Sequence, residues 1–449
     1  MNDKNEQSHY IISGRYLLPT WRQADRIDNG AIAVYQDRVT AIGTREQLRA
    51  KFPEAKELHE PAGLIMPGLI NTHTHAPMSY LRGIADDLPL MTWLQDHIFP
   101  VEQKLDGEMV YHSTLLSIAE MIKSGTTSFC DMYLFAGEVA RAADESGIRA
   151  WIGEVLYDFD SPSYGKLDNG FEVARKLFAS YRDHPLITIT VDPHSVYTCA
   201  PSLLERSGAL AEEFDSLLVV HLAETESEVA TCIERYGLTP VEHLEKLGLL
   251  NSRVLAAHCV QLTPEEIQLL AARQVRVSHC VESNMKLASG AAPIPELLKH
   301  GICVSIGTDG PASNNDVDMF SEMSSVAKVH KVVTMDPTAM DAETTLCCGT
   351  INGAKALRAD TEIGTLEPGK KADLIVLDLD QPHLVPIYNL PSHLIYAARG
   401  GDVIHSMING RLVMKGRKLL TINEQMVIGK MQEISSRVLQ IRAEAEAGR

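Results

Sequence analysis

The sequence predicts an α/β protein, in which a (β/α)8 barrel of the TIM type carries a small composite β-sandwich domain made from both termini. Between about residues 64 and 357, eight short apolar runs alternate with longer amphipathic stretches, which is the pattern of parallel strands and crossover helices. On both sides of this region, short strand-like runs and turns replace the alternation. Eight such units in about 300 residues are typical of one barrel, whose active site lies at the carboxyl ends of the strands.

These changes of pattern divide the chain into three predicted regions. Residues 1–64 are expected to form the N-terminal part of the β-sandwich domain, with strands within 9–18 and 30–43. Residues 65–360 are expected to form the barrel. Residues 361–449 are expected to return to the sandwich through strands within 371–380 and 401–416, followed by a helical tail over 423–447.

The eight barrel strands are expected where apolar runs end in polar residues. Amphipathic segments such as 115–124, 136–145 and 263–273 lie between them and are expected to be helices. A helical segment clearly follows every strand except the last. The strands are expected within residues 63–75, 125–133, 149–159, 186–195, 217–225, 253–260, 275–281 and 303–310.

The composition is that of a globular enzyme, with 45% hydrophobic and 22% charged residues in 449. A formal net charge of −18 repels nucleic acids and anionic membranes, and neither is an expected partner. The N-terminal segment is polar, and no apolar run approaches the roughly 18 residues that span a bilayer. Eight scattered cysteines without a C-x-x-C pair are expected to be reduced. We therefore expect a cytoplasmic protein.

The first candidate metal ligands are His73 and His75, at the end of the first barrel strand. Residues two apart on a strand point to the same side, so both imidazoles can reach one ion, although two unrelated histidines give the same spacing. His221 ends the fifth strand, and Asp309 follows the eighth. Since all four groups stand at carboxyl ends of strands, the sequence predicts a His3Asp metal site with an open position for water. This donor set suits zinc, and iron, manganese and nickel are alternatives.

Further polar residues at the same end of the barrel are candidate catalytic groups. Glu224, three residues after His221, is expected to reach the metal centre without being a ligand, or else only to begin a helix. His258, after the sixth strand, is expected to donate a hydrogen bond to the reacting oxygen. His279, after the seventh strand, is equally well explained as a buried structural imidazole.

Two other interpretations of the motifs are rejected. The fourth strand lacks the lysine with which some barrel hydrolases bridge two ions, which favours one metal. Residues 364–371, GTLEPGKK, nearly match a phosphate-binding loop, but Lys371 stands where a hydroxyl is required and a strand follows instead of a helix. Motifs of serine hydrolases, zincins and dinucleotide-binding enzymes are missing.

Taken together, PGLINTHTH, HLAE, HCV and GTDG resemble the amidohydrolase superfamily, specifically its metal-dependent aminohydrolase branch. The flanking segment GTLEPGKKADLIVLD is also similar, so the resemblance covers nearly the whole chain. Residues 81–90, Trp93, 100–102 and 283–290 resemble the 5-methylthioadenosine/S-adenosylhomocysteine deaminases. The resemblance implies a hydrolase acting on carbon–nitrogen bonds in cyclic amidines, which removes ammonia from an adenine ring.

The resemblance also implies roles for particular residues. Residues matching His73, His75, His221 and Asp309 bind zinc in that family. Those matching Glu102, His194, Glu224 and Asp309 meet the substrate, and Trp93 is expected beside them. A homodimer or homotetramer is plausible for the family. In the implied mechanism, Asp309 accepts a proton from water, Glu224 protonates the ring and His258 stabilises the tetrahedral oxygen.

Two alternatives stay open at this point. A relative acting on guanine, another aminated heterocycle or a chlorinated triazine would use the same centre, and an acidic binding scaffold would need no metal. The substrate tail is a separate question, because Glu154 stands near the third strand end where some family members have an arginine. Glu154 is expected to repel a carboxylate tail, which favours methylthioadenosine over S-adenosylhomocysteine, unless Arg82 or Lys286 supplies the missing charge.

Overall fold

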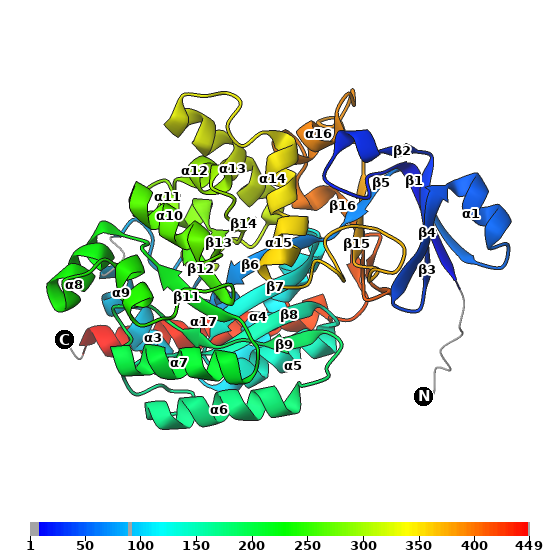
Figure 1. Cartoon of the computed structure of the whole chain (residues 1–449). Helices are drawn as coiled ribbons and strands as arrows, with labels where there is room; N and C mark the ends of the chain where they lie inside the picture. The colour runs from blue at the N-terminus through cyan, green and yellow to red at the C-terminus, as the bar shows by residue number, and fades with distance from the viewer. Residues whose placement is uncertain (1–8, 89–91, 448–449) are drawn as a thin grey trace.

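The computed structural model describes residues 9–88 and 92–447. Pro89 and Leu90, the end of one segment on which the family resemblance rests, lie outside the described residues. The predicted fold class is confirmed: a barrel of parallel strands surrounded by helices stands beside a β-sheet built from both parts of the chain (Figure 1).

The barrel strands lie where the apolar runs predict them. The first half of the barrel has the order β10-β8-β7-β6 with β9 beside β8, and the second half has the order β11-β12-β13-β14. All of these pairs are parallel. The strands are β6 (Leu69–Thr74), β7 (Thr126–Tyr133), β8 (Arg149–Leu156), β9 (Ile187–Ile189), β10 (Asp192–Pro193), β11 (Leu218–Leu222), β12 (Val254–His258), β13 (Arg276–His279) and β14 (Val304–Ile306).

Hydrogen bonds at two seams close the barrel. At one seam, Val191 forms an isolated parallel bridge to Leu218. At the other, the Asp309 amide donates to the His73 carbonyl at 3.0 Å. The fourth barrel strand, predicted as one run over 186–195, is interrupted at residues 190–191 and so forms two short pieces, β9 and β10, both of which pair with β8.

The inside of the barrel contains a polar layer below the site. Thr72 Oγ1 lies 2.7 Å from Ser278 Oγ and 2.8 Å from Ser305 Oγ, and all three side chains are fully buried. Asn71 Nδ2 donates to Thr308 Oγ1 at 2.7 Å. Because buried polar groups are costly unless paired, this hydrogen-bonded layer fixes the relative positions of β6, β13 and β14.

Helices follow the barrel strands in the predicted alternation. Several begin with an N-cap threonine. At Thr263, the hydroxyl accepts from the Glu266 amide and the Glu266 carboxylate accepts from the Thr263 amide, which is a capping box. The helix that the sequence does not show clearly after the eighth strand is α13 (Met319–Thr334). The other helices of the barrel wall are α4 (Gly107–Lys123), α5 (Ala136–Ser146), α6 (Leu167–Ser180), α7 (Pro201–Glu213), α8 (Glu226–Tyr236), α9 (Pro240–Lys246), α10 (Pro264–Ala272) and α12 (Ile294–Lys299).

Shorter helical segments lie at the strand ends and between the two parts of the molecule. Near the site are η2 (Ala76–Leu81), the π-helical η3 (Trp93–Ile98), α3 (Phe99–Glu102) and α11 (Val281–Lys286). Away from it are η1 (Gln23–Asp25), α1 (Arg45–Lys51), α14 (Ala342–Cys348), α15 (Ile351–Ala356), α16 (Leu390–Tyr396) and η4 (Gly400–Asp402).

The second β unit is one nine-stranded sheet that combines N-terminal and C-terminal segments, blue and orange to red at the right of Figure 1. Its two halves meet where β5 pairs antiparallel with β15. Ile32, Ile65 and Val376 belong to one buried core cluster on this sheet. The strands are β1 (Tyr10–Leu17), β2 (Ile27–Asp28), β3 (Gly30–Tyr35), β4 (Arg38–Thr44), β5 (Lys56–Pro67), β15 (Leu374–Asp378), β16 (Val403–Ile408), β17 (Arg411–Lys415) and β18 (Lys418–Leu419).

The predicted helical tail is α17 (Glu424–Ala447), which returns from the sheet to the barrel. Lys123 Nζ lies 2.5 Å from Glu424, and Lys430 Nζ lies 3.2 Å from Glu108, so α17 packs along α4. The domain limits at 64/65 and 360/361 stay predictions, and β5 runs across the first of them.

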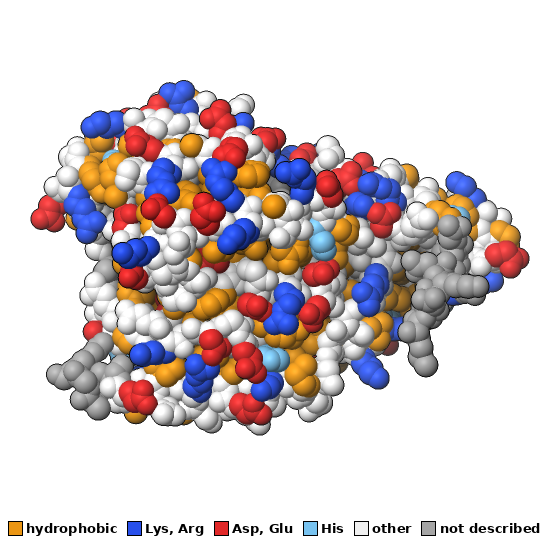
Figure 2. All heavy atoms as spheres, turned by 90° about the horizontal axis from the view of Figure 1, so that it is seen from below, with side chains coloured by type: hydrophobic (Ala, Val, Ile, Leu, Met, Phe, Trp, Pro, Cys, Tyr) orange, Lys and Arg blue, Asp and Glu red, His pale blue; other side chains and the backbone are white. Residues whose placement is uncertain are grey.

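The described surface carries charges of both signs. On the face shown in Figure 2, Lys and Arg side chains are interspersed with Asp and Glu rather than gathered in one area. Among the helices that the structure describes, none combines the length and the apolar character needed to cross a bilayer.

Candidate active site

The predicted ligands converge at the carboxyl end of the barrel. His73, His221, His258 and Asp309 offer ligand atoms that all lie within 4.8 Å of one another, and all four side chains are buried. His75 joins them, since its Nε2 lies 3.2 Å from both His221 Nε2 and Asp309 Oδ1. The structure therefore brings the four predicted ligands together and places His258 directly beside them.

The chemistry of these atoms fits a divalent metal ion. Within the described residues, Nδ1 and Nε2 of His73 and Oδ1 of Asp309 are buried and have no hydrogen-bond partner. Orphaned polar atoms of this kind are costly in a protein interior, and a shared cation compensates them. Three imidazoles and one carboxylate are a common donor set of catalytic metal sites.

Three of the four predicted ligands are held in the protonation state that a metal requires. Burial raises the pKa of Asp309, but the adjacent His73 and His75, whose Nε2 atoms lie 3.5 and 3.2 Å from its Oδ1, and the charges of nearby imidazoles hold it well below its usual value. Burial lowers the pKa of His73 to about 4, and burial with the neighbouring imidazoles lowers the pKa of His221 well below normal. Burial lowers the pKa of His75, but its contact with the charged Asp309 raises it to about 9, so His75 has to release a proton when it binds an ion.

Hydrogen bonds to the outer atoms of the ligands fix their orientation. Nδ1 of His75 lies 2.5 Å from the Met132 carbonyl, and Nδ1 of His221 lies 2.7 Å from the His194 carbonyl. Both rings must donate from Nδ1 and therefore present Nε2 to the centre.

Asp309 is fixed in a comparable way. Its Oδ2 accepts from Ser283 at 2.6 Å and from Ser313 at 2.8 Å, so that Oδ1 faces the histidines. Asp309 has a left-handed backbone, with φ of 60°, an uncommon conformation outside glycine that these contacts support. Nothing in the sequence singles out Ser313, whereas Ser283 belongs to one of the resemblance segments.

Glu224 and His258 form a second pair beside the ligand set. Nε2 of His258 lies 3.8 Å from Oε2 of Glu224. Burial raises the pKa of Glu224, and the positive charge of His258 opposes this shift. Glu224 begins no helix, because α8 starts at Glu226, and its backbone amide donates to Glu228 at 2.7 Å. This contact, not foreseen from the sequence, holds Glu224 at the strand end.

Asn284 orients His258. Its Oδ1 lies 2.9 Å from Nδ1 of His258, so that the imidazole donates there and directs Nε2 toward Glu224. We expect Asn284→Ala to lower kcat by about 10- to 100-fold while metal content is unchanged, because the outer partner of an active-site imidazole fixes its tautomer. Metal analysis and steady-state kinetics check this.

Asn284→Asp, which keeps an acceptor at the same position, should recover most of the turnover. Asn251→Ala is the matched control, since Asn251 caps the opposite end of β12 through its bond to the Arg253 amide. Equal losses in Asn284→Ala and Asn251→Ala would indicate a general effect on the barrel and contradict the orienting role.

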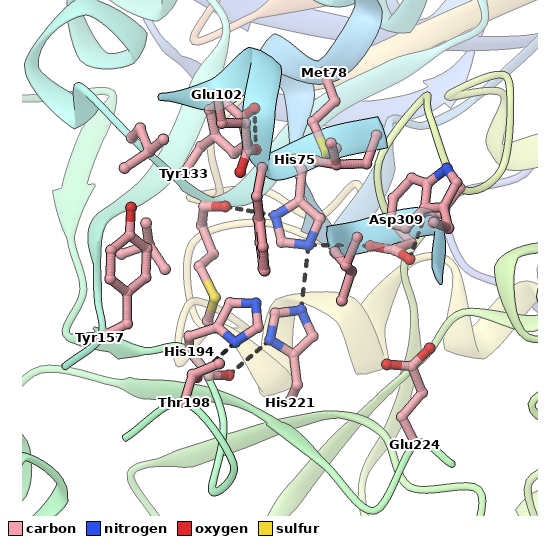
Figure 3. A pocket seen from close by; sticks show the side chains of 18 of the residues that line it. His75, Met78, Glu102, Tyr133, Tyr157, His194, Thr198, His221, Glu224 and Asp309 are labelled. Atoms are coloured by element: carbon pink, nitrogen blue, oxygen red, sulfur yellow. Dashed lines mark hydrogen bonds and ion pairs between the residues drawn. The ribbon is translucent and has the colours of Figure 1, made fainter. Parts of the chain in front are cut away.

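A pocket of about 740 Å³ opens beside the metal ligands (Figure 3). It contains all three residues that the resemblance adds for substrate contact. Trp93 lines the pocket from η3. Glu102, at the end of α3, accepts from the Tyr133 hydroxyl at 2.6 Å, and burial raises its pKa. His194 has Nδ1 2.9 Å from Thr198 Oγ1, and burial lowers its pKa to about 3.

Three other residues considered from the sequence are engaged elsewhere. His279 lies with Nε2 2.9 Å from Nε2 of His330 and does not line the pocket, which agrees with a structural imidazole. Lys286 pairs with Asp86 at 2.7 Å, and Arg82 pairs with Glu120 at 2.5 Å, so neither is directed at the pocket. The rejected phosphate loop is likewise engaged in pairing, because Lys371 contacts Asp37.

The expectation that Glu154 repels a substrate carboxylate is wrong. Glu154 is 2% exposed, does not line the pocket, and accepts from the amides of Phe135 at 3.2 Å and Ala136 at 2.8 Å. It caps the start of α5, where unpaired amides attract a carboxylate. Arg149, at the start of β8, does not line the pocket either and pairs with Asp373 at 2.8 Å.

We expect Glu154→Ala to lower the free energy of unfolding by about 1–3 kcal/mol, because the buried Ala136 amide loses its acceptor and the Phe135 amide keeps only the Ser163 hydroxyl. The ratio of kcat/KM for methylthioadenosine and S-adenosylhomocysteine should change by less than about 2-fold, since no pocket contact is removed. Chemical denaturation and kinetics on both compounds test this. A large change of this kcat/KM ratio in the milder Glu154→Gln variant would show that Glu154 does act on the substrate tail.

The fold and this site together define a metal-dependent hydrolase of the barrel type. The model of the amidohydrolase family matches residues 64–413. A protein named 5-methylthioadenosine/S-adenosylhomocysteine deaminase from Syntrophobacter fumaroxidans is 52% identical over 410 residues, 91% of this chain and 94% of the relative. One from Syntrophus aciditrophicus, named deaminase 1, is 47% identical over 429 residues, 95% of this chain and 97% of the relative.

Two solved structures share the fold of this chain. An adenosine deaminase from Xanthomonas campestris with bound zinc has a TM-score of 0.95 and 40% identity, covering 96% of this chain and 99% of its own. Atrazine chlorohydrolase TrzN from Arthrobacter aurescens, complexed with zinc, has a TM-score of 0.87 at 22% identity, covering 95% and 100%, which shows the fold alone. The chain belongs to the amidohydrolase family and, within it, to the 5-methylthioadenosine/S-adenosylhomocysteine deaminases.

Proposed function

We propose that this protein is a metal-dependent hydrolytic deaminase of adenosine-type nucleosides. Its substrate would be 5′-methylthioadenosine, S-adenosylhomocysteine, adenosine or a 5′-modified analogue, and its products ammonia and the inosine-type nucleoside. The observation that carries the proposal is the Glu224–His258 pair, 3.8 Å apart, beside the buried His and Asp side chains at one end of the pocket. The names of relatives 52% and 47% identical support the same reaction.

We propose one divalent ion per chain, held by His73, His75, His221 and Asp309, with Zn²⁺ as the expected metal. The zinc reported in the structure from Xanthomonas campestris supports this choice. Fe²⁺, Mn²⁺ and Ni²⁺ accept the same donors, and metal analysis of the purified protein distinguishes them. When bound, the ion supplies Lewis acidity, which lowers the pKa of water toward 7.

The residues of this chain would move the protons. The ionised Asp309 can accept a proton from the attacking water, because its Oδ1 faces the centre and carries no other bond. Glu224, whose pKa is raised by burial, can carry a proton and give it to the ring nitrogen next to the amino-bearing carbon. His258 would donate a hydrogen bond to the oxygen that becomes negatively charged.

Three further side chains would hold the nucleoside. Trp93 offers an aromatic surface, and His194 offers its Nε2, since Nδ1 is occupied by Thr198 (Figure 3). Glu102 retains one carboxylate oxygen for the ribose, because Tyr133 contacts the other. These roles come from the family resemblance, and the presence of all three in one pocket with Asp309 supports them.

The proposal is tested by ammonia release from a panel of aminated heterocycles with the metal-loaded protein. Adenosine-type nucleosides should be deaminated, whereas guanine, a chlorinated triazine and cytidine should react at least about 100-fold more slowly, because a site that pairs polar groups rejects analogues lacking them. A higher rate with guanine or a triazine than with adenosine-type nucleosides would indicate an amidohydrolase of different substrate specificity. A protein without ammonia release or stoichiometric metal would fit a binding scaffold.

Other properties follow from the family resemblance and remain proposals. We propose a homodimer or homotetramer, which light scattering coupled to size exclusion would establish. We also keep the proposals of a cytoplasmic location and of no nucleic-acid or membrane partner. The small-molecule substrate itself agrees with the pocket beside the ligands and with the nucleoside-deaminase relatives.

A further inference from the structure

The pocket has two chemically different ends. Its lining includes His221, Glu224, His258 and Asp309 and also three aromatic side chains that contact one another. We call Phe99, Tyr157 and Phe159 the aromatic wall. Figure 3 shows Tyr157 across the pocket from Asp309 and Glu224. A nucleoside whose amino-bearing ring reaches Glu224 therefore directs its opposite end, the 5′ substituent, toward the aromatic wall.

The aromatic wall is an ordered surface. The rings of Tyr157 and Phe159 stack with centroids 3.9 Å apart and an interplanar angle of 12°. Phe99 meets Phe159 at 6.0 Å and 56°. Tyr157 is 8% exposed, whereas Phe159 is 44% exposed. Because Phe159 also lines the pocket, a ligand that covers it removes apolar surface from water.

The charges near the aromatic wall disfavour an anionic tail. Among the described residues, the pocket lining contains neither lysine nor arginine. Asp158 and Asp160 flank Phe159, and both are exposed. An adjoining cavity that shares Phe99 and Phe159 is lined by Arg235, whose Nη1 already donates to the Tyr197 carbonyl at 2.9 Å. A carboxylate brought here would lose water and meet like charge without a dedicated partner.

We propose that the aromatic wall binds the 5′ substituent and makes the enzyme selective for adenosines with an apolar 5′-thioether. The inference rests on the proposed deaminase function and deepens it. A thioether sulfur is polarisable and makes favourable contacts with aromatic rings, and its methyl group adds apolar area. The 5′-hydroxyl of adenosine gains less from this surface, and the homocysteine tail brings a carboxylate that it does not pair.

The test compares kcat/KM for 5′-methylthioadenosine, adenosine and S-adenosylhomocysteine in the metal-loaded wild type and in variants. In the wild type, kcat/KM should be about 10-fold or more higher for methylthioadenosine than for S-adenosylhomocysteine. Small differences between substrates in an apolar pocket typically have effects of this size on kcat/KM. Phe159→Ala should lower kcat/KM for methylthioadenosine by about 10-fold, mainly through KM, and for adenosine by less than about 3-fold.

Phe159→Leu should recover part of this loss of kcat/KM. Tyr388→Ala removes another exposed aromatic residue, one outside the pocket, and should change nothing.

The outcomes separate the two proposals. If none of the three nucleosides is deaminated, the proposed function fails. If all are deaminated but Phe159→Ala lowers methylthioadenosine and adenosine equally, only the role of the aromatic wall is overturned. A wild-type preference for S-adenosylhomocysteine that Arg235→Gln abolishes would also overturn it, because charge would then select the 5′ end.

Discussion

Replacing His73, His75 or His221 with alanine should remove bound metal and deaminase activity together. Each imidazole supplies one of four closely spaced donors, and His258, the further imidazole beside them, is directed toward Glu224 by Asn284. Losing one donor leaves the remaining buried polar atoms uncompensated and lowers metal affinity. We expect metal content well below one ion per chain. Turnover should fall by at least about 10³-fold, because the whole proposed mechanism depends on the ion.

The measurement is elemental analysis of each purified variant beside its ammonia release. His184→Ala is the matched control, because His184 pairs with Asp144 at 3.2 Å away from the pocket and should keep both properties. Circular dichroism verifies that the variants are folded. A full complement of metal in any two of the three ligand variants would show that the ligand assignment is wrong.

Glu224→Gln should retain the metal and lose most of the turnover. Glutamine preserves the size of the side chain and removes its ability to carry a proton, a role typically worth about 10²- to 10⁴-fold in rate. Since Glu224 is buried beside His258 and is not among the predicted ligands, its carboxylate matters for the reaction rather than for the ion. The loss should fall on kcat more than on KM.

Glu226→Gln, an exposed change at the start of α8, is the control for charge near the strand end. It should leave kcat within about 2-fold, as surface substitutions usually do. Near-normal turnover in Glu224→Gln would exclude Glu224 as the proton carrier. Loss of metal in this variant would instead make it a ligand and require a different proton donor.

The barrel could be predicted from the sequence because its signals are local. Eight apolar runs ending in polar residues locate the strands, and the carboxyl ends of parallel strands necessarily meet at one face. The same rule brings His73, His75, His221 and Asp309 together, although they come from three separate segments. The split of the fourth strand into β9 and β10, which both pair with β8, was not predicted, because residues 186–195 form one continuous strand-like run in the sequence.

The direction of single side chains was harder to predict than their location. Glu154 stands at a strand end, as do the ligands, but free amides at the start of α5 bind its carboxylate outside the pocket. His279 is bound by His330 from a helix 51 residues further on. Ser313 and Phe159 acquire their roles only from tertiary contacts, one with Asp309 and the other with Tyr157. Short-range patterns carry no information about such partners.

The central claim, a deaminase with one catalytic metal per chain, is tested most directly by a metal titration. Chelator-treated protein is supplied with increasing Zn²⁺ while ammonia release from 5′-methylthioadenosine is measured. Activity should rise in proportion to added metal and reach its plateau at one equivalent per chain, because the described ligand atoms form one cluster. Activity that is independent of metal, or that reaches its plateau only at two equivalents, would contradict the account.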